Sequence, residues 1–471
     1  MKLLLIVFTL PILAISLPVC GENRVPTHRS EPPKSIHTFN PQEGDTVVFL
    51  GDSITHQCLY TQYLETFFYT RFPERRIRFH NAGVAGDKVG DALIRFEEDV
   101  ASMSPSFVFI LLGMNDGQYE SFSAETNATY EKGMAELLDR INHLGATAIL
   151  LSPTMFDHHQ LALRRNDETF RFRDKEFDPS YNALLAYYGA TARELAASRS
   201  LRFVDLWSPL NDYTMANRSL EADFTLIEDA IHPGAAGHFV MTFEILVATH
   251  TERPAVSDIV VRRGKGGWKA ANKENVTNLD PSLSGDELQF TFEARSLPWL
   301  VPENASEVNL RWGPSAPAEL GATLTQAAHR LGLETLQVKG LRPGTYELMI
   351  DGSKIGEFSH HQLASKLELQ EFGPSPQALQ ALAVANLNRT RNDEAIRPIR
   401  DLWSQIKGLR KKGEGSLEQQ LPKILDQIEE KKKLAMQIEK KIYLVNQPKP
   451  RQYHLRRLNE KSSVSAPGPD E

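Results

Sequence analysis

The chain between residues 45 and 250 alternates short apolar runs with longer amphipathic segments. The apolar runs are nearly continuous, as is typical of strands that helices cover on both faces. Strand-like and helix-like segments alternate five times, which predicts a parallel sheet flanked by helices in an α/β domain. We expect strands at Thr46–Leu50, Ile77–Asn81, Phe107–Leu112, Ala146–Ser152 and Leu201–Asp205, and helices at about 57–71, 87–101, 126–144, 178–199 and 234–250.

The pattern changes after residue 250. Residues 256–360 contain short β-type runs separated by Gly and Pro, which predicts a small antiparallel β domain. A hairpin is expected around Asp351-Gly352. Residues 361–458 are expected to be helical, with Pro422 in the first turn of a helix. The apolar residues that recur there at helical spacing are Ile424, Ile428, Ala435, Ile438 and Ile442.

Both ends of the chain differ from the middle. Residues 1–21 combine Lys2, an apolar run too short for a comfortable membrane span, and small residues near Gly21, which predicts a signal peptide and export. A lipoprotein attached at Cys20 is the alternative, although Val19 fits that motif poorly. Residues 22–44 are expected to form a polar leader and residues 459–471 a disordered tail.

Composition narrows the class of protein. A chain of 471 residues with 41% hydrophobic and 24% charged residues is globular, with two or three domains expected. The formal net charge of −7 argues against nucleic acid as a partner. The chain has two cysteines, and Cys20 leaves with the signal peptide, so Cys58 is left without a disulfide partner.

Polar residues follow several of the expected strands. In an open parallel sheet, ligands bind beyond the carboxyl ends of the strands, so the segments after the strands are expected to meet there. These segments are Gly51-Asp52-Ser53, Asn81-Ala82-Gly83-Val84-Ala85-Gly86-Asp87, Gly113-Met114-Asn115-Asp116 and, further along, Asp229-Ala230-Ile231-His232-Pro233.

Together these residue types are the parts that acyl transfer requires. Ser53 supplies a hydroxyl nucleophile, and His232 supplies a base that accepts a proton near neutral pH. Asp229, three residues earlier, is close enough to hold the imidazole in one tautomer. The oxyanion is expected to bind the backbone N–H groups of Ser53 and Gly86 and the side-chain amide of Asn115.

Four sequence blocks resemble those of the SGNH, or GDSL, hydrolase family. They are FLGDSIT, NAGVAGD, LLGMNDG and DAIHPGAAGH, in the family's order and spacing. The resemblance covers about residues 45–250. It implies a flavodoxin-like α/β/α sandwich, Ser53, Asp229 and His232 as the catalytic triad, Gly86 and Asn115 as oxyanion donors, and hydrolysis of carboxylic esters or thioesters or deacetylation of sugars.

Several other residues are candidates for chemistry or for structure. Asp52 and Asp116 are expected to cap helices or hold loops, Cys58 to be buried and inert, and His238 to lie on a helix surface or in the core. His56 is expected either to line the pocket or to lie in an exposed loop. Asp157-His158-His159 lacks further ligands at recognisable spacing, so no metal or cofactor is expected.

A long charged segment, Thr154–Pro179, is expected to form a lid or binding loop beside the site. Its arginines Arg164, Arg165, Arg171 and Arg173 would suit an anionic substrate, or are simply solvated. A second wall is expected from residues 211–228, with Tyr213 and Phe224.

The sequence thus predicts a secreted serine esterase that deacetylates a carbohydrate such as an acetylated polysaccharide. A lipase, lysophospholipase or thioesterase of the same fold is an alternative. An acyltransferase, or a non-catalytic envelope protein that binds through its β and helical modules, is an alternative of another class. The acyl chain length and the oligomeric state are left open.

Overall fold

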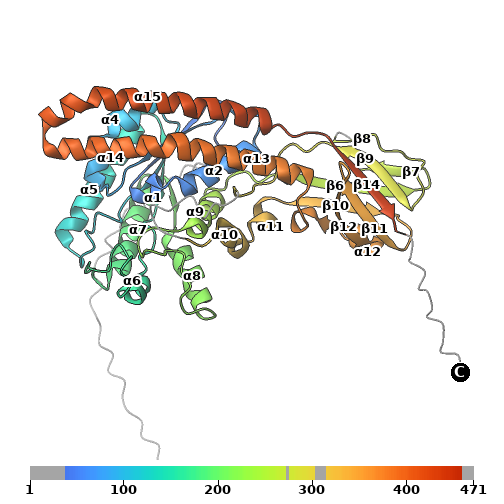
Figure 1. The fold of residues 1–471 in the computed structure, drawn as a ribbon, viewed down its shortest axis with the longest axis horizontal. Helices are drawn as coiled ribbons and strands as arrows, with labels where there is room; N and C mark the ends of the chain where they lie inside the picture. Colours follow the sequence, from blue (N-terminus) through green and yellow to red (C-terminus); the bar gives the residue numbers. More distant parts are fainter. Residues whose placement is uncertain (1–37, 272–274, 303–314, 459–471) are drawn as a thin grey trace, which may run out of the picture. The chain divides into compact units, whose positions relative to one another are not determined.

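The computed structural model describes residues 38–271, 275–302 and 315–458 (Figure 1). These residues belong to one compact unit. The signal peptide expected at residues 1–21 and the tail expected at residues 459–471 lie outside the described residues, as does most of the leader. The domain boundaries expected near residues 250 and 360 stay predictions.

The first half of the chain forms a five-stranded parallel sheet in the order β2-β1-β3-β4-β5. β1 pairs with β2 on one side and with β3 on the other, so that β2 is an edge strand. All six residues of β1 are buried, as expected for a strand that is covered on both faces. The strands are β1 (Thr46–Gly51), β2 (Arg78–Gly83), β3 (Phe107–Leu111), β4 (Thr147–Leu151) and β5 (Arg202–Val204).

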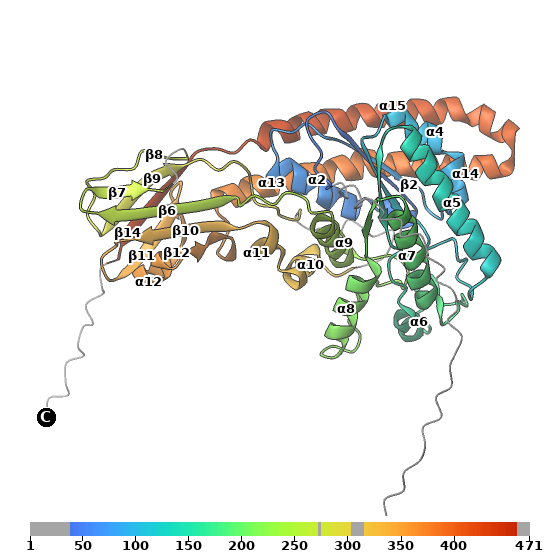
Figure 2. The same cartoon turned by 180° about the vertical axis from the view of Figure 1, so that it is seen from behind.

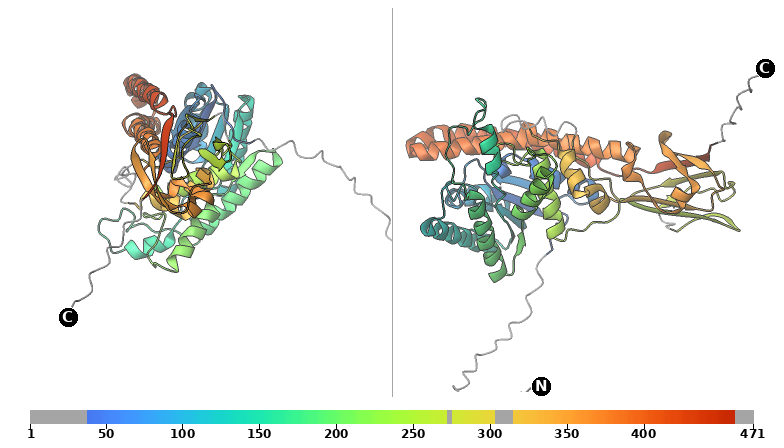
Figure 3. Two further views of the ribbon diagram at one scale, coloured as in Figure 1. Left: turned by 90° about the vertical axis from the view of Figure 1, so that its right-hand side faces the viewer. Right: turned by 90° about the horizontal axis from the view of Figure 1, so that it is seen from below.

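The strand order determines which helices cover which face. The crossover from β1 to β2 runs in the opposite direction to the later crossovers, and because all are right-handed, their helices lie on opposite faces. Accordingly α2 contacts α9, whereas α5 contacts α3 and α7 (Figure 3). The predicted flavodoxin-like sandwich is confirmed. Its helices are α1 (Ser53–His56), α2 (Leu59–Arg71), α3 (Val89–Ile94), α4 (Phe96–Asp99), α5 (Ala124–His143), α6 (His158–Arg164), α7 (Tyr181–Ser198), α8 (Trp207–Arg218) and α9 (Ala235–Ala248).

The β region consists of two sheets that share one apolar core. One sheet has the order β13-β10-β6-β7 and the other β12-β11-β14-β9-β8. The expectation of a purely antiparallel domain is wrong for one pair, because β6 and β10 run parallel. The strands are β6 (Ser257–Gly264), β7 (Gly267–Ala270), β8 (Val276–Thr277), β9 (Glu287–Phe292), β10 (Glu334–Lys339), β11 (Thr345–Ile350), β12 (Ser353–Ser359), β13 (Leu367–Glu368) and β14 (Arg451–Arg457), with the short helices α10 (Ala318–Thr325), α11 (Ala327–Leu331) and α12 (His360–Ala364) between them.

The predicted hairpin joins β11 to β12. Asp351 and Gly352 form its turn with φ angles of 50° and 78°. Positive φ at both central residues is characteristic of the tight turn that matches the twist of the strands.

The C-terminal region contains α13 (Pro376–Arg391), a π-helical turn (Asn392–Ile396), α14 (Arg397–Lys412) and α15 (Glu414–Val445). α13 contacts α2, and α14 lies against α15 in both Figure 1 and Figure 2. The five apolar residues expected to recur on one helical face, Ile424 to Ile442, are all buried.

Two expectations for this region are wrong. Pro422 does not begin a helix; α15 starts at Glu414 and continues through it. Pro422 is exposed, and the apolar face that follows it is held by packing, which compensates for the missing N–H donor. Residues 361–458 are also not helical throughout, because β13 lies within this range, and because Tyr453 and Leu455 alternate as the buried residues of β14, which pairs with β9 and β11.

Candidate active site

Ser53 stands where β1 meets α1. It is the first residue of that helix and is 5% exposed. The preceding Asp52 caps the helix, because its Oδ1 accepts the N–H of Ile54 at 2.9 Å. A Cβ at Gly51 would lie 2.1 Å from Thr55 Oγ1, so only glycine allows the strand to turn this tightly into the helix.

His232 connects Ser53 to Asp229. Its Nε2 lies 2.9 Å from Ser53 Oγ, and its Nδ1 lies 2.8 Å from Asp229 Oδ2. The other oxygen of Asp229, Oδ1, accepts the backbone N–H groups of Ile231 at 3.0 Å and His232 at 2.7 Å. The carboxylate therefore both shapes the turn and orients the ring. The structure brings together the three residues that the sequence nominates as a triad.

Asn115 lies between the segments that carry Ser53 and Gly86. Its Nδ2 donates to Asp87 O at 3.1 Å and lies 3.3 Å from Asp52 Oδ2. Tyr119 Oη donates to Asn115 Oδ1 at 3.1 Å, which fixes the amide with its NH₂ group toward these acceptors. Gly86 has a φ of 70°, and a Cβ there would approach only Lys407 Nζ, at 4.0 Å.

Burial controls the charges around Ser53. It raises the pKa of Asp52 to about 7 and that of Asp116 to about 6. Burial also acts to raise the pKa of Asp229, but attraction to His232 and hydrogen bonds from His232 and Ile231 outweigh it, so the pKa is lowered. Asp229 is therefore the carboxylate held in its charged form beside the imidazole.

Asp52 and Asp116 have the structural contacts that the sequence predicts. Asp52 caps α1, and Asp116 Oδ1 accepts the N–H of Val89 at the start of α3 at 2.9 Å. Cys58 is buried and burial raises the pKa of its thiol to about 12, which is consistent with an inert residue. His238 lies in the core, where burial lowers its pKa to about 3.

His56 does not lie in an exposed loop. It is fully buried in α1, and its Nε2 lies 3.1 Å from Asp401 Oδ1 on α14. Asp157 contacts Arg218 and Thr225 rather than the two histidines that follow it. Across the parts of the chain that the structure describes, no group of three or more potential metal ligands is present.

The segment 154–179 contains α6 and polar turns. Arg164 pairs with Asp167 and donates to Glu228 O, whereas Arg165 pairs with Glu176. In the second expected wall, residues 211–228, part of the segment is α8, and Tyr213 and Phe224 are half-buried against the core. The arginines of the expected lid are therefore held in part by the protein's own acidic groups.

Several residues around the site have no recognisable signal in the sequence. Tyr119 lies four residues after Asn115, but nothing in the sequence indicates that it would orient the amide. Arg95 donates to Gly51 O, Ala82 O and the carboxylates of Asp87 and Asp99.

Within the residues that the structure describes, no helix has the length and apolarity needed to cross a membrane.

Comparison with known proteins is consistent with this geometry. Residues 49–239 match the model of the GDSL-like Lipase/Acylhydrolase family. An acetylxylan esterase from Geobacillus stearothermophilus is 27% identical over 220 residues, which are 42% of this chain and 90% of that protein. A solved structure of a gut microbial diltiazem-metabolizing enzyme superposes with a TM-score of 0.73 at 25% identity, over 90% of this chain and 100% of that one. Residues 49–239 therefore form a domain of the GDSL-like lipase/acylhydrolase family, and the chain is a carboxylic ester hydrolase with the SGNH fold.

Proposed function

We propose that this hydrolase is an exported serine esterase in which Ser53, His232 and Asp229 form the catalytic triad. The observation that carries the proposal is the hydrogen-bonded chain from Ser53 Oγ through both ring nitrogens of His232 to Asp229, with steps of 2.9 and 2.8 Å. These distances lie within the range that proton transfer to a general base requires.

The reaction proceeds by double displacement. Ser53 Oγ attacks the acyl carbon while His232 Nε2 takes its proton, and Asp229 stabilises the imidazolium that forms. The imidazolium then gives this proton to the leaving alkoxide, which departs as the alcohol and leaves an acyl-serine. Water attacks the acyl-serine, with His232 again as base, and releases the carboxylic acid and free Ser53.

The oxyanion of each tetrahedral intermediate binds the N–H groups of Ser53 and Gly86 and the Nδ2 amide of Asn115. The open space at Gly86 and the orientation of the Asn115 amide by Tyr119 support these roles. No hydrogen-bond acceptor for the Gly86 N–H is found among the described residues, so this donor remains available to a ligand. Loss of one such donor typically lowers the rate by about 10²–10³-fold.

We propose an acetylated carbohydrate as the substrate. The similarity of residues 49–239 to an acetylxylan esterase supports an acetyl group on a sugar. The signal-like sequence of residues 1–21 supports export to a compartment where polysaccharides are found. The carbohydrate assignment is tested by measuring acetate release from acetylated xylan and pectin.

A small-molecule ester is the second candidate substrate. It is supported by the match, over 90% of this chain, to an enzyme named for diltiazem metabolism. Relative kcat/KM for acetylated oligosaccharides and for diltiazem distinguishes the two substrates. Inclusion of an acceptor alcohol during the assay distinguishes hydrolysis from acyl transfer, because a transferase would form the new ester.

The catalytic assignment is tested with Ser53→Ala on p-nitrophenyl acetate. We expect almost complete loss of activity, because the nucleophile is removed while the fold is kept. Ser198→Ala is the matched control, since Ser198 lies on the exposed surface of α7 and donates to Leu195 O of the same helix. Wild-type activity in Ser53→Ala would contradict the proposed mechanism.

A further inference from the structure

The edge of the main sheet is covered by basic side chains from the C-terminal helices. β2 is the edge strand, and its carbonyl groups at alternate residues require hydrogen-bond donors that no neighbouring strand provides. Arg391 donates to Phe79 O at 3.4 Å, and Arg400 donates to Asn81 O at 2.7 Å and to Gly83 O at 3.0 Å.

This series of contacts continues past the end of β2. Lys407 Nζ lies 3.5 Å from Ala85 O, two residues after Gly83. Arg400 and Lys407 are seven residues apart on α14, which places them on one helical face two turns apart. A single face of α14 therefore follows the chain from the sheet edge into the segment that carries Gly86.

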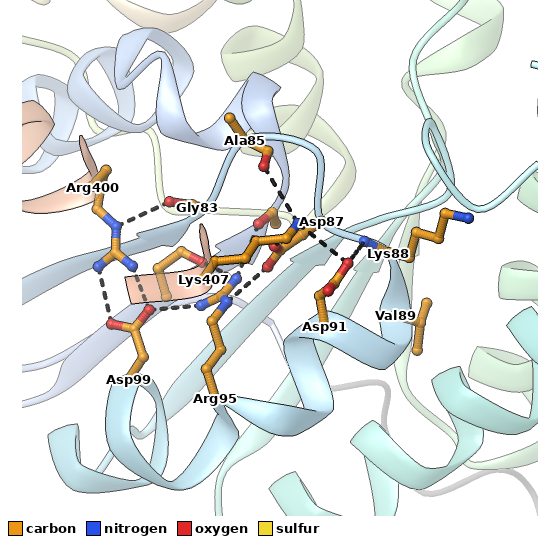
Figure 4. Close-up of polar contacts among 12 residues, drawn as sticks. Gly83, Ala85, Asp87, Lys88, Val89, Asp91, Arg95, Asp99, Arg400 and Lys407 are labelled. Carbon is orange, nitrogen blue, oxygen red and sulfur yellow. Dashed lines mark hydrogen bonds and ion pairs between the residues drawn. The ribbon is translucent and has the colours of Figure 1, made fainter. Parts of the chain in front are cut away.

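Carboxylates connect the same basic groups to each other, as Figure 4 shows. Arg400 pairs with Asp99, and Arg95 Nη1 lies 2.6 Å from Asp99 Oδ2. Arg95 Nε also donates to Asp87 at 2.8 Å, and Lys407 contacts the other oxygen of Asp87 at 2.8 Å. The result is a continuous chain of alternating charges, Arg400–Asp99–Arg95–Asp87–Lys407, that is largely shielded from solvent.

Lys407 binds both neighbours of Gly86 in the sequence. It contacts the carbonyl of Ala85 on one side and the carboxylate of Asp87 on the other, and it reaches Asp91 at 3.2 Å. The backbone carbonyl of Asp87 in turn accepts the amide of Asn115 at 3.1 Å. The peptide N–H of Gly86 is therefore fixed between groups that α14 holds.

We propose that Lys407 is a positioning residue for the oxyanion site, and that α14 thereby completes an active site whose proposed catalytic groups all come from residues 53–232. The inference rests on the proposed function, because it assigns to Lys407 the task of aiming the proposed Gly86 donor. Donor position strongly affects rate, since hydrogen bonds to an oxyanion act only at the correct geometry.

A purely structural role for Lys407 would lead to a different effect of its replacement on kcat and on the melting temperature. Asp87 also contacts Arg95, at 2.8 Å, so we expect the segment to remain folded but less constrained when Lys407 is replaced. A positioning role therefore lowers kcat with little change in KM, whereas a stabilising role alone lowers the melting temperature and leaves the kinetics of the folded enzyme unchanged.

The test compares Lys407→Met with Lys407→Arg on p-nitrophenyl acetate, using the full chain. We expect Lys407→Met to lower kcat by about tenfold or more with KM changed by less than about twofold. Lys407→Arg, which keeps the charge, should recover most of the lost kcat. Lys411→Met is the matched control on the exposed part of α14 and should behave as wild type.

Wild-type kcat in Lys407→Met, or a loss shared equally by Lys411→Met, would overturn the inference. Circular-dichroism melts show which variants are folded at the assay temperature, so that only folded enzyme is compared. Ser53→Ala is measured in parallel: an active Ser53→Ala variant rejects the proposed function itself, whereas an inactive one together with a fully active Lys407→Met rejects only the role of Lys407.

Discussion

Replacement of Asp229 by asparagine separates the role of this residue in shaping the turn from its role in orienting His232. Asp229 Oδ1 accepts two backbone N–H groups, and asparagine keeps that oxygen, so the turn before His232 is preserved. Only Oδ2, which lies 2.8 Å from His232 Nδ1, becomes an NH₂ group. That group cannot accept from Nδ1–H, so the imidazole proton moves to Nε2, which then faces Ser53 Oγ as a donor and no longer as a base.

The size of the loss in kcat distinguishes the loss of one hydrogen bond from the loss of the correct tautomer. Loss of one hydrogen bond to a charged group is worth about 1.5–3 kcal/mol, or roughly 10–150-fold in rate. Loss of the correct tautomer lowers kcat by about 10⁴-fold in serine proteases that use the same triad, which corresponds to about 5.5 kcal/mol. We therefore expect Asp229→Asn to lose about 10⁴-fold in kcat.

The assay is steady-state hydrolysis of p-nitrophenyl acetate, with active enzyme corrected for folded fraction. Glu228→Gln is the matched control, because it makes the same acid-to-amide change one residue earlier, at a side chain whose Oε1 accepts the N–H of Ala316. A loss of kcat in Asp229→Asn of no more than about 150-fold would refute the assignment of Asp229 as the residue that orients His232.

Three further predictions concern groups near the site. Burial raises the pKa of Glu228 to about 7 in the folded protein, so the protonated carboxyl contributes stability that is fully present below about pH 4.5 and is lost as the pH rises through 7. Glu228→Gln should therefore have a higher melting temperature than wild type at pH 8 and a similar one near pH 5. The reverse order would contradict this. Tyr119→Phe should lower kcat by roughly fivefold, the equivalent of about 1 kcal/mol for one hydrogen bond, as measured by steady-state kinetics; an unchanged kcat would show that the Asn115 amide needs no support. Because Arg164 and Arg165 are paired with acidic groups of the chain, replacing both with alanine should leave the ratio of kcat/KM for anionic and neutral esters unchanged, and a lost preference for anionic esters would show that they bind substrate.

The sequence is most informative where the physical signal is local. The strands of the main sheet are nearly continuous apolar runs, and the turn residues after them carry the nominated site, so both could be predicted from residues within a few positions of each other. The burial of Ile424 to Ile442 follows from helical spacing in the same way.

Features that depend on distant contacts could not be predicted. β14 has only Tyr453 and Leu455 as alternating apolar residues, and its strand conformation depends on pairing with β9 and β11. Lys407 resembles any other lysine on a charged helix, because its contact with Asp87 spans 320 residues. The prediction that Pro422 lies in the first turn of a helix was wrong, because tertiary packing of α15 outweighs the local penalty of proline.

The proposed mechanism requires Ser53 to be the nucleophile, activated by His232. It is tested most directly by treating the protein with a p-nitrophenyl organophosphate and locating the modified residue by peptide mass spectrometry. We expect one phosphorylated peptide per chain, modified at Ser53, with much slower labelling in His232→Ala. Labelling at another residue, or equal rates of labelling in wild type and His232→Ala, would contradict it.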